Sequence, residues 1–153
     1  MYYIIAGIAV VIVIAVGNYF IWQNRRNQED ETPLDEMEGH DFEYYCADLL
    51  RDHGFIDVEV TKGSGDYGVD ILAEKDGITY AIQCKRYSEP VGVKAVQEAY
   101  SGRDYYDRMV GAVLTNQYFT QPAVDLAKKL KILLWDRGYL EQMMEESAMM
   151  DGQ

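Results

Sequence analysis

Apolar and polar residues alternate with a period that changes along the chain, and each change predicts an element. Residues 39–53 carry apolar side chains at helical spacing, which predicts an amphipathic helix. Residues 55–61 alternate apolar and polar as a half-buried strand does. Two further apolar runs, 68–74 and 78–85, flank the short turn Lys75-Asp76-Gly77, and this arrangement predicts a hairpin.

The second half of the chain predicts alternating helices and strands. Residues 91–106 form the next helical pattern, and the continuous apolar run 109–114 predicts a strand that is buried on both faces and pairs in parallel with an earlier strand. Thr120 is expected to cap a third helix, and residues 131–135 to form a last strand. Asp136 is expected to open a final helix that frays into an acidic tail. The fold class is therefore α/β: a sandwich around a mixed sheet, in the order helix, three-stranded meander, helix, strand, helix, strand, helix.

The N-terminal segment is different in character. Residues 4–22 are uncharged and flanked by aromatic side chains, and Arg25 and Arg26 follow at once. This length and these flanks predict a transmembrane helix over residues 1–23, a single-pass anchor that leaves the C-terminal part in the cytoplasm. A cleaved signal peptide would want a basic start, and a buried core helix would be shorter. The acidic segment 24–37 reads as a linker.

The hairpin carries the candidate metal-binding and catalytic residues. Asp70 lies inside an apolar run, where a carboxylate is costly unless it meets a cation. Because side chains alternate along a strand, Gln83 and Lys85 point to one face and Cys84 to the other. Asp70 and Gln83 can then share a divalent cation, with the backbone carbonyl of Cys84 as a further oxygen ligand. Lys85 can orient or deprotonate a water, or stabilise charge on a phosphate.

The spacing of these residues resembles a known motif. GVD followed by QCK resembles the PD-(D/E)xK nuclease core, in the D…QxK form of Mrr-type restriction endonucleases. Further similar stretches lie at 39–55, 60–71, 81–87 and 114–129. The resemblance covers residues 38–140 and leaves an acidic tail at 141–153. It implies a restriction-endonuclease-like sandwich that hydrolyses double-stranded DNA with Mg²⁺, for which Mn²⁺ substitutes, and that serves in defence against foreign DNA.

The resemblance also implies roles for individual residues. Asp70 is the main metal ligand, Gln83 the second, and Lys85 the catalytic lysine. Glu43, in the first helix, is a further acid that reaches the metal directly or through water. By itself Glu43 would read as a solvated acid in a first helical turn. Gln83 supplies a neutral amide where a carboxylate would add charge, so Mg²⁺ should bind weakly unless Glu43 or Asp66 compensates.

The net charge of the chain affects its expected affinity for DNA. The net charge is −12, which opposes attraction to phosphates, although more than half of the excess lies outside residues 38–140. Binding to DNA is therefore expected to be weak and salt-sensitive, helped by a homodimer or by the membrane anchor. Asp66 reads equally well as a turn residue, a second metal carboxylate or a DNA contact. The candidate nucleic-acid-binding residues are Lys62, Asp66, Arg86 and Lys94.

Fewer residues of the sequence support the other classes of function. Cys46 and Cys84 are too few for a disulfide framework and read as buried thiols in a reducing compartment. A cysteine protease built on Cys84 would need a histidine motif that neither His40 nor His53 provides. A catalytically inactive, membrane-tethered nucleic-acid- or partner-binding module of the same fold is the main alternative, and a structural membrane adaptor is the third.

Overall fold

The computed structural model describes residues 33–63, 65 and 67–151, and the chain separates into two units, residues 1–36 and 37–153. The first unit contributes one described element, the short helix α2 (Pro33–Glu36). The second unit holds the predicted order of elements. They are α3 (Gly39–Asp52), β1 (Ile56–Val60), β2 (Ile71–Lys75), β3 (Ile78–Lys85), α4 (Val93–Tyr105), β4 (Val110–Thr115), α5 (Gln121–Leu130), β5 (Ile132–Trp135) and α6 (Arg137–Asp151).

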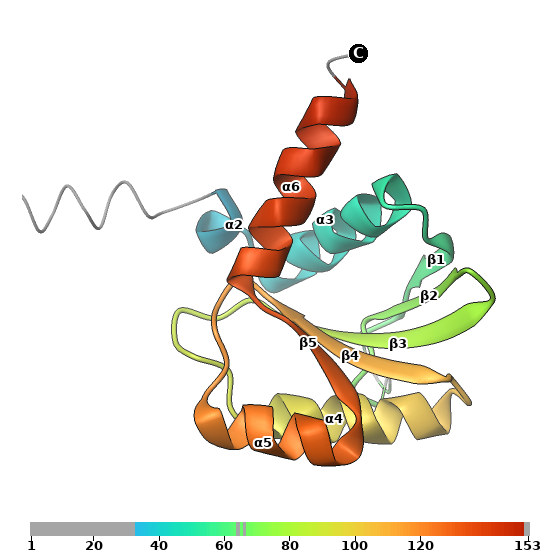
Figure 1. Ribbon diagram of the computed structural model, residues 1–153, viewed down its shortest axis with the longest axis vertical. Coiled ribbons are helices and arrows are strands. Elements are labelled where there is room, and N and C mark those ends of the chain that lie inside the picture. The colour runs from blue at the N-terminus through green and yellow to red at the C-terminus, as the bar shows by residue number, and fades with distance from the viewer. Residues whose placement is uncertain (1–32, 64, 66, 152–153) are drawn as a thin grey trace, which may run out of the picture. The chain divides into compact units, whose positions relative to one another are not determined.

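The five strands form one mixed sheet in the order β1-β2-β3-β4-β5 (Figure 1). The first three strands are antiparallel neighbours, and β3, β4 and β5 run parallel. The β2–β3 turn needs left-handed backbone at both central positions, and Asp76 and Gly77 have φ values of 53° and 77°. Asp and Gly are the residues that tolerate this conformation best. The predicted hairpin and the predicted parallel strand are both confirmed.

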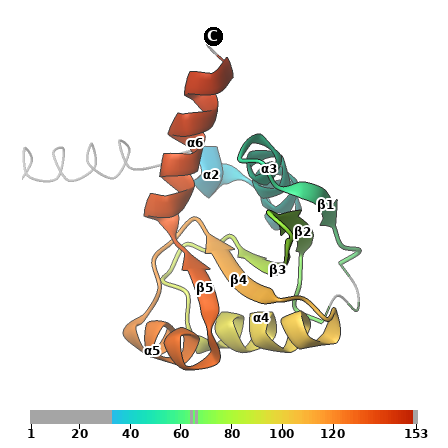
Figure 2. The same ribbon diagram turned by 45° about the vertical axis from the view of Figure 1, so that its right-hand side comes forward.

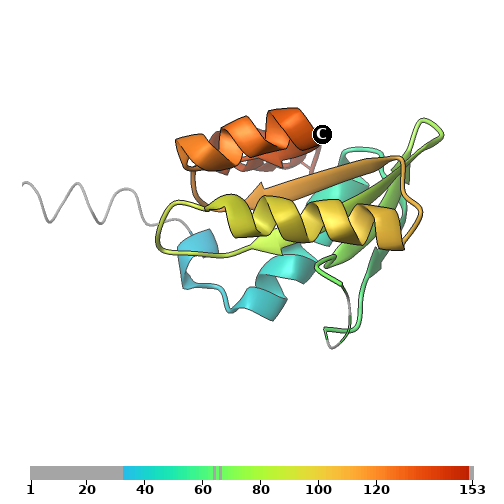
Figure 3. The same ribbon diagram turned by 90° about the horizontal axis from the view of Figure 1, so that it is seen from below.

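Helices cover both faces of the sheet. Helices α4 and α5 pack on one face, and α3 and α6 lie on the other (Figures 1 and 2). Seen from below, α4 crosses the strands that it connects (Figure 3). Its buried residues are small, chiefly Ala95, Val96 and Ala99, so its backbone comes close to β3 and β4. The opposite face is filled by larger side chains of α3, among them Phe42 and Leu50.

The C-terminal helix differs from the expected fraying tail. Helix α6 continues to Asp151, through the segment that we had predicted to fray. Leu140, Met143 and Ser147 are buried on it at the spacing of one helical face. His53, at the end of α3, lies 3.2 Å from the carboxylate of Glu146. Packing of this buried face and the contact with His53 therefore stabilise α6, although its sequence is rich in acidic residues.

The predicted membrane segment, residues 4–22, lies outside the described residues, as does Asp66. Within the described part of the chain, every helix is too short or too polar to cross a bilayer. Four residues of the predicted linker, Pro33–Glu36, form the helix α2.

Candidate active site

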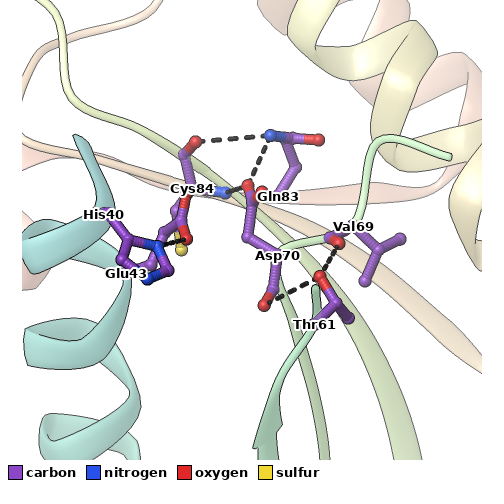
Figure 4. Close-up of polar contacts among 7 residues, drawn as sticks. All are labelled: His40, Glu43, Thr61, Val69, Asp70, Gln83 and Cys84. Carbon is purple, nitrogen blue, oxygen red and sulfur yellow. Dashed lines mark hydrogen bonds and ion pairs between the residues drawn. The ribbon is translucent and has the colours of Figure 1, made fainter. Parts of the chain in front are cut away.

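Asp70 sits where three strands meet. It directly precedes β2, and its backbone N–H donates to the carbonyl of Ile82 at 2.9 Å. Its own carbonyl accepts from the N–H of Thr61 at 2.8 Å, and the Thr61 hydroxyl donates to the carbonyl of Val69 (Figure 4). These bonds fix the backbone of Asp70 between the end of β1 and the middle of β3, so its side chain has a defined direction.

Asp70 is buried, with 8% of the residue exposed, and its carboxylate faces β3. Its Oδ2 atom accepts from the backbone N–H of Cys84 at 2.6 Å and from the side-chain Nε2 of Gln83 at 2.5 Å (Figure 4). Hydrogen bonds to an ionised acceptor are short and strong. The structure thus brings together Asp70 and Gln83, the two side chains that we predicted to share a cation.

The amide of Gln83 has one satisfied end and one orphaned end. Its Nε2 donates to Asp70 and also lies 3.3 Å from the carbonyl oxygen of Cys84. Its Oε1 is buried and has no hydrogen-bond partner within the described residues, which is unusual for a buried polar atom. Turning the amide over would direct Oε1 to the point that Nε2 occupies, beside Asp70 Oδ2 and the carbonyl oxygen of Cys84. Only a cation would make that arrangement favourable, and hard divalent ions prefer such all-oxygen sets. The residues present therefore fit a small divalent cation.

Lys85 lies at the end of β3 and reaches α4. Its Nζ atom is 2.7 Å from Oε2 of Glu98. Burial lowers the pKa of Lys85, but the hydrogen bond and charge of Glu98, together with the charge of Asp70, outweigh burial and raise the pKa above 10.5. Lys85 is therefore an ammonium that Glu98 holds at the end of β3, two residues after Gln83.

Glu98 is a site residue that sequence reasoning missed. Gln97 is exposed on this helix, whereas Glu98 faces Lys85. The signal available in the sequence was Gly68, because glycine is the residue type that permits positive φ or a close approach of another backbone. Gly68 has φ +78°, and a Cβ built there would lie 2.8 Å from Cβ of Glu98.

Glu43 projects from α3 on the other side of Cys84 (Figure 4). Its Oε2 is 3.0 Å from Nδ1 of His40, one turn earlier on the same helix. The pKa of the Cys84 thiol is raised by a hydrogen bond with Cys46, then by burial, and further by the charges of Asp70 and Glu43. Both acids are therefore near Cys84, with Glu43 paired to the exposed His40.

The candidate metal ligands carry little negative charge. In the described ranges no group of three or more histidine, cysteine, aspartate or glutamate side chains is placed to hold a metal ion. Cys46 and Cys84 are both buried free thiols, as predicted. A cation at this site would therefore depend on one carboxylate, Asp70, assisted by neutral oxygens.

The candidate nucleic-acid contacts occupy different environments. Lys62 is exposed after β1, and Lys94 is 86% exposed in the first turn of α4. Arg86 is half-buried, and its Nε donates to the carbonyl of Met37 at 2.5 Å. The loop after Lys85 is held by Asn116, whose side chain accepts from Tyr87 N–H and donates to Tyr87 carbonyl, each at 2.9 Å.

Solved structures share this fold. A protein of unknown function, AF1548, is 24% identical with a TM-score of 0.62 over 72% of this chain and 67% of its own. The DNA modification-dependent restriction endonuclease AspBHI is 19% identical with a TM-score of 0.58, over 77% of this chain and 36% of its own. MspJI restriction endonuclease, solved in complex with a 27-mer oligonucleotide, is 16% identical with a TM-score of 0.55, over 71% of this chain and 28% of its own. The chain thus spans only about a third of each restriction enzyme.

Sequence comparison identifies the family. A comparison with curated proteins found no match. Residues 34–144 match the family Mrr_cat, described as restriction endonuclease, and this range includes every strand of the sheet together with Asp70, Gln83 and Lys85. The chain therefore belongs to the Mrr_cat restriction endonuclease family.

Proposed function

We propose that this chain is a Mg²⁺-dependent endonuclease that hydrolyses phosphodiester bonds in double-stranded DNA, with Mn²⁺ able to replace Mg²⁺. The observation that carries the proposal is the convergence of Asp70 Oδ2, the amide of Gln83 and the carbonyl of Cys84 on one point. Lys85 stands beside that point. Membership of a restriction endonuclease family supports the same reaction class.

The residues divide the chemistry between them. Asp70 would be the charged ligand of the metal, and Gln83 Oε1 and the Cys84 carbonyl would be neutral ligands, with Glu43 acting directly or through a water. A bound Mg²⁺ would supply Lewis acidity toward the phosphate and lower the pKa of a water. Because Gln83 is uncharged, we expect affinity for Mg²⁺ to be low.

Lys85 acts on the reacting phosphate. The ammonium has three N–H donors and forms an ion pair with Glu98. Its N–H groups can donate to a phosphate oxygen on which charge develops, or orient the attacking water. Because its pKa is raised, Lys85 serves as a donor and a positive charge at neutral pH, and not as the base.

DNA would be held by its phosphates. Lys62, Arg86 and Lys94 are the cations that we assign to this contact, with Asp66 nearby in sequence. The complex of MspJI with a 27-mer oligonucleotide supports a nucleic-acid partner for this fold. The net charge of −12 makes the predicted affinity low and steeply dependent on salt.

The proposal also includes a membrane anchor and a homodimer, which would place the nuclease domain near its DNA. Residues 4–22 would anchor the chain as a single-pass membrane protein with the nuclease domain in the cytoplasm. A homodimer would bring two copies of the site to a duplex, since one site cuts one strand at a time. Either arrangement would raise the effective concentration of a weakly binding domain at DNA.

A non-catalytic module of the same fold is the second candidate. It is favoured by the hydrogen bonds that already satisfy Asp70 Oδ2 within the protein and by the neutral Gln83. Such a module would bind nucleic acid or a protein partner from the membrane without cutting. It predicts binding of DNA with no cleavage in the presence of any divalent ion.

Plasmid nicking by the full chain separates the two. We expect supercoiled plasmid to be nicked with Mg²⁺ or Mn²⁺ but not with EDTA, and Lys85→Ala to lower the rate by at least about a hundredfold. Lys128→Ala, an exposed lysine on α5, is the matched control and should keep the wild-type rate. Thermal unfolding of each variant checks that the fold is intact. If wild type binds DNA but nicks none with either ion, the nuclease proposal is wrong.

A further inference from the structure

We propose that Glu98 is the positioning residue of this site: its carboxylate, carried on α4, holds the Lys85 ammonium beside Asp70 and Gln83. The inference rests on the proposed nuclease function, to which it adds a fifth side chain beside Asp70, Gln83, Lys85 and Glu43. Glu98 acts through Lys85 and is not assigned a contact with substrate.

The ion pair itself is short and sheltered. Lys85 Nζ lies 2.7 Å from Glu98 Oε2, and the two side chains are 18% and 28% exposed. Ion pairs that lie fully in solvent contribute little, because they are screened and costly to order. Here the pair joins the end of a central strand to a helix that packs on the same strand. Its effect is therefore to select one position for a long and flexible side chain.

The two oxygens of Glu98 face different lysines. Oε1 lies 3.8 Å from Nζ of Lys94, one helical turn away, whose side chain is 86% exposed. Oε2 faces Lys85, the more buried of the two. The outer pair can exchange with solvent and so can offer Lys94 to DNA, whereas the inner pair stays in place. One carboxylate thus links a lysine of the site to a lysine of the proposed DNA contact.

Helix α4 is seated directly on the segment that leads into Asp70. At Gly68 an added Cβ would lie 2.8 Å from Cβ and 3.0 Å from the carbonyl oxygen of Glu98. At Gly102, one turn further on, it would lie 2.2 Å from Cγ2 of Val69 and 2.9 Å from the carbonyl of Tyr67. Two glycines therefore bring the backbones together at both ends of this contact. Glu98 therefore lies against the segment that leads into Asp70, and Lys85 is paired to it there.

The reaction rate depends on how precisely the Lys85 ammonium is positioned, and not only on its being near the site. Catalytic groups act through their distance and direction to the reacting atoms, and a displacement of about 1 Å can cost about a hundredfold in rate. Without Glu98, the four-carbon stem of Lys85 would sample several rotamers or turn toward Asp70. The loss would appear in turnover more than in DNA binding, because Lys85 contributes a small part of the phosphate contact.

Steady-state nicking of DNA by the full chain tests the role. We expect Glu98→Ala to lower kcat by at least about tenfold with KM for DNA within about threefold. Glu98→Gln keeps an oxygen that accepts from Lys85, so it should recover part of that loss. Gln97→Ala, an exposed neighbour on the same helix, is the matched control. A kcat for Glu98→Ala and Glu98→Gln equal to that of Gln97→Ala would overturn the proposal.

Lysine ammonium signals in ¹H–¹⁵N NMR spectra provide a readout that needs neither metal nor activity. The full chain, in mild detergent because residues 4–22 are apolar, should give one slowly exchanging ammonium signal that Lys85→Ala removes. Glu98→Ala should abolish its protection from exchange, Glu98→Gln should weaken it, and Gln97→Ala should leave it. Persistence of the protected signal in Glu98→Ala would overturn the proposal. A wild-type chain that shows the signal but never cuts DNA would instead overturn the nuclease function, and the role of Glu98 in it.

Discussion

Oδ2 of Asp70 accepts a hydrogen bond from the backbone N–H of Cys84 at 2.6 Å, so the carboxylate is tied to β3 at the residue between Gln83 and Lys85. That tie depends on an acceptor at position 70 but not on its charge. Charge and hydrogen bonding at Asp70 can therefore be separated by mutation.

Asp70→Asn should retain the fold and lose the activity. Both hydrogen bonds end on Oδ2, so an asparagine whose oxygen takes that place can still accept from the Cys84 N–H and from Gln83 Nε2. We expect metal-dependent nicking to fall by at least about a hundredfold with the free energy of unfolding within about 1 kcal/mol of wild type. Asp70→Ala leaves a buried N–H without its partner and should cost about 1–3 kcal/mol. Urea unfolding that ranks the two variants in the opposite order would contradict this.

Gln83→Glu tests the neutral ligand. A second carboxylate beside Asp70, which is 8% exposed, adds repulsion in the metal-free protein and affinity for a divalent cation. We expect thermal unfolding in EDTA to shift to lower temperature and the affinity for Ca²⁺, measured by calorimetry, to rise about tenfold. Gln97→Glu places the same charge at an exposed position and should change neither. Unchanged Ca²⁺ affinity in Gln83→Glu would argue against a metal at this position.

Three glycines of the loop before Asp70 should differ in their tolerance of alanine. Gly68 combines φ +78° with a Cβ position 2.8 Å from Glu98, Gly65 has φ +84° with open space, and Gly63 has open space alone. We expect Gly65→Ala to lose about 1 kcal/mol, Gly68→Ala about 2–4 kcal/mol, and Gly63→Ala almost nothing. Urea unfolding gives the three values. Equal losses at 68 and 65 would show that α4 is not seated closely on this segment.

The Lys85–Glu98 pair predicts a specific pH dependence of stability. The pKa of Lys85 is raised above 10.5 because Glu98 and Asp70 outweigh the effect of burial. A raised lysine pKa contributes stability that is fully present below the unfolded value and lost as pH rises through the folded value. The stability difference between wild type and Lys85→Met should therefore stay constant from about pH 7 to 9 and shrink above about pH 10.5. Shrinkage already below pH 9, relative to Lys128→Met, would contradict the pairing.

The hairpin and the parallel strand could be predicted because their signals are local. Asp76-Gly77 determines the turn, and with the turn known, alternation determines that Gln83 and Lys85 share a face. The uninterrupted apolar run of β4 indicates burial on both sides. The approach of Asp70 to Gln83 followed from these two facts.

Glu98 could not be predicted because its helix is seated on the sheet mainly by small residues. The buried positions of α4 are Ala95, Val96, Ala99 and Gly102, whereas Val93 is 38% exposed. Small residues carry little signal in a hydrophobic pattern, but they are what allows α4 to approach the sheet closely. The bond from Cys84 N–H to Asp70 escaped notice for a related reason, since it joins a backbone group to a side chain across strands.

Anomalous scattering from crystals of the full chain grown with Mn²⁺ tests the central claim most directly. The account predicts one strong peak bounded by Asp70 Oδ2 and the carbonyl oxygen of Cys84, with Gln83 turned so that Oε1 faces the ion and Lys85 still paired with Glu98. Absence of Mn²⁺ at that point, with the Gln83 Nε2 to Asp70 hydrogen bond intact at saturating metal, would contradict it.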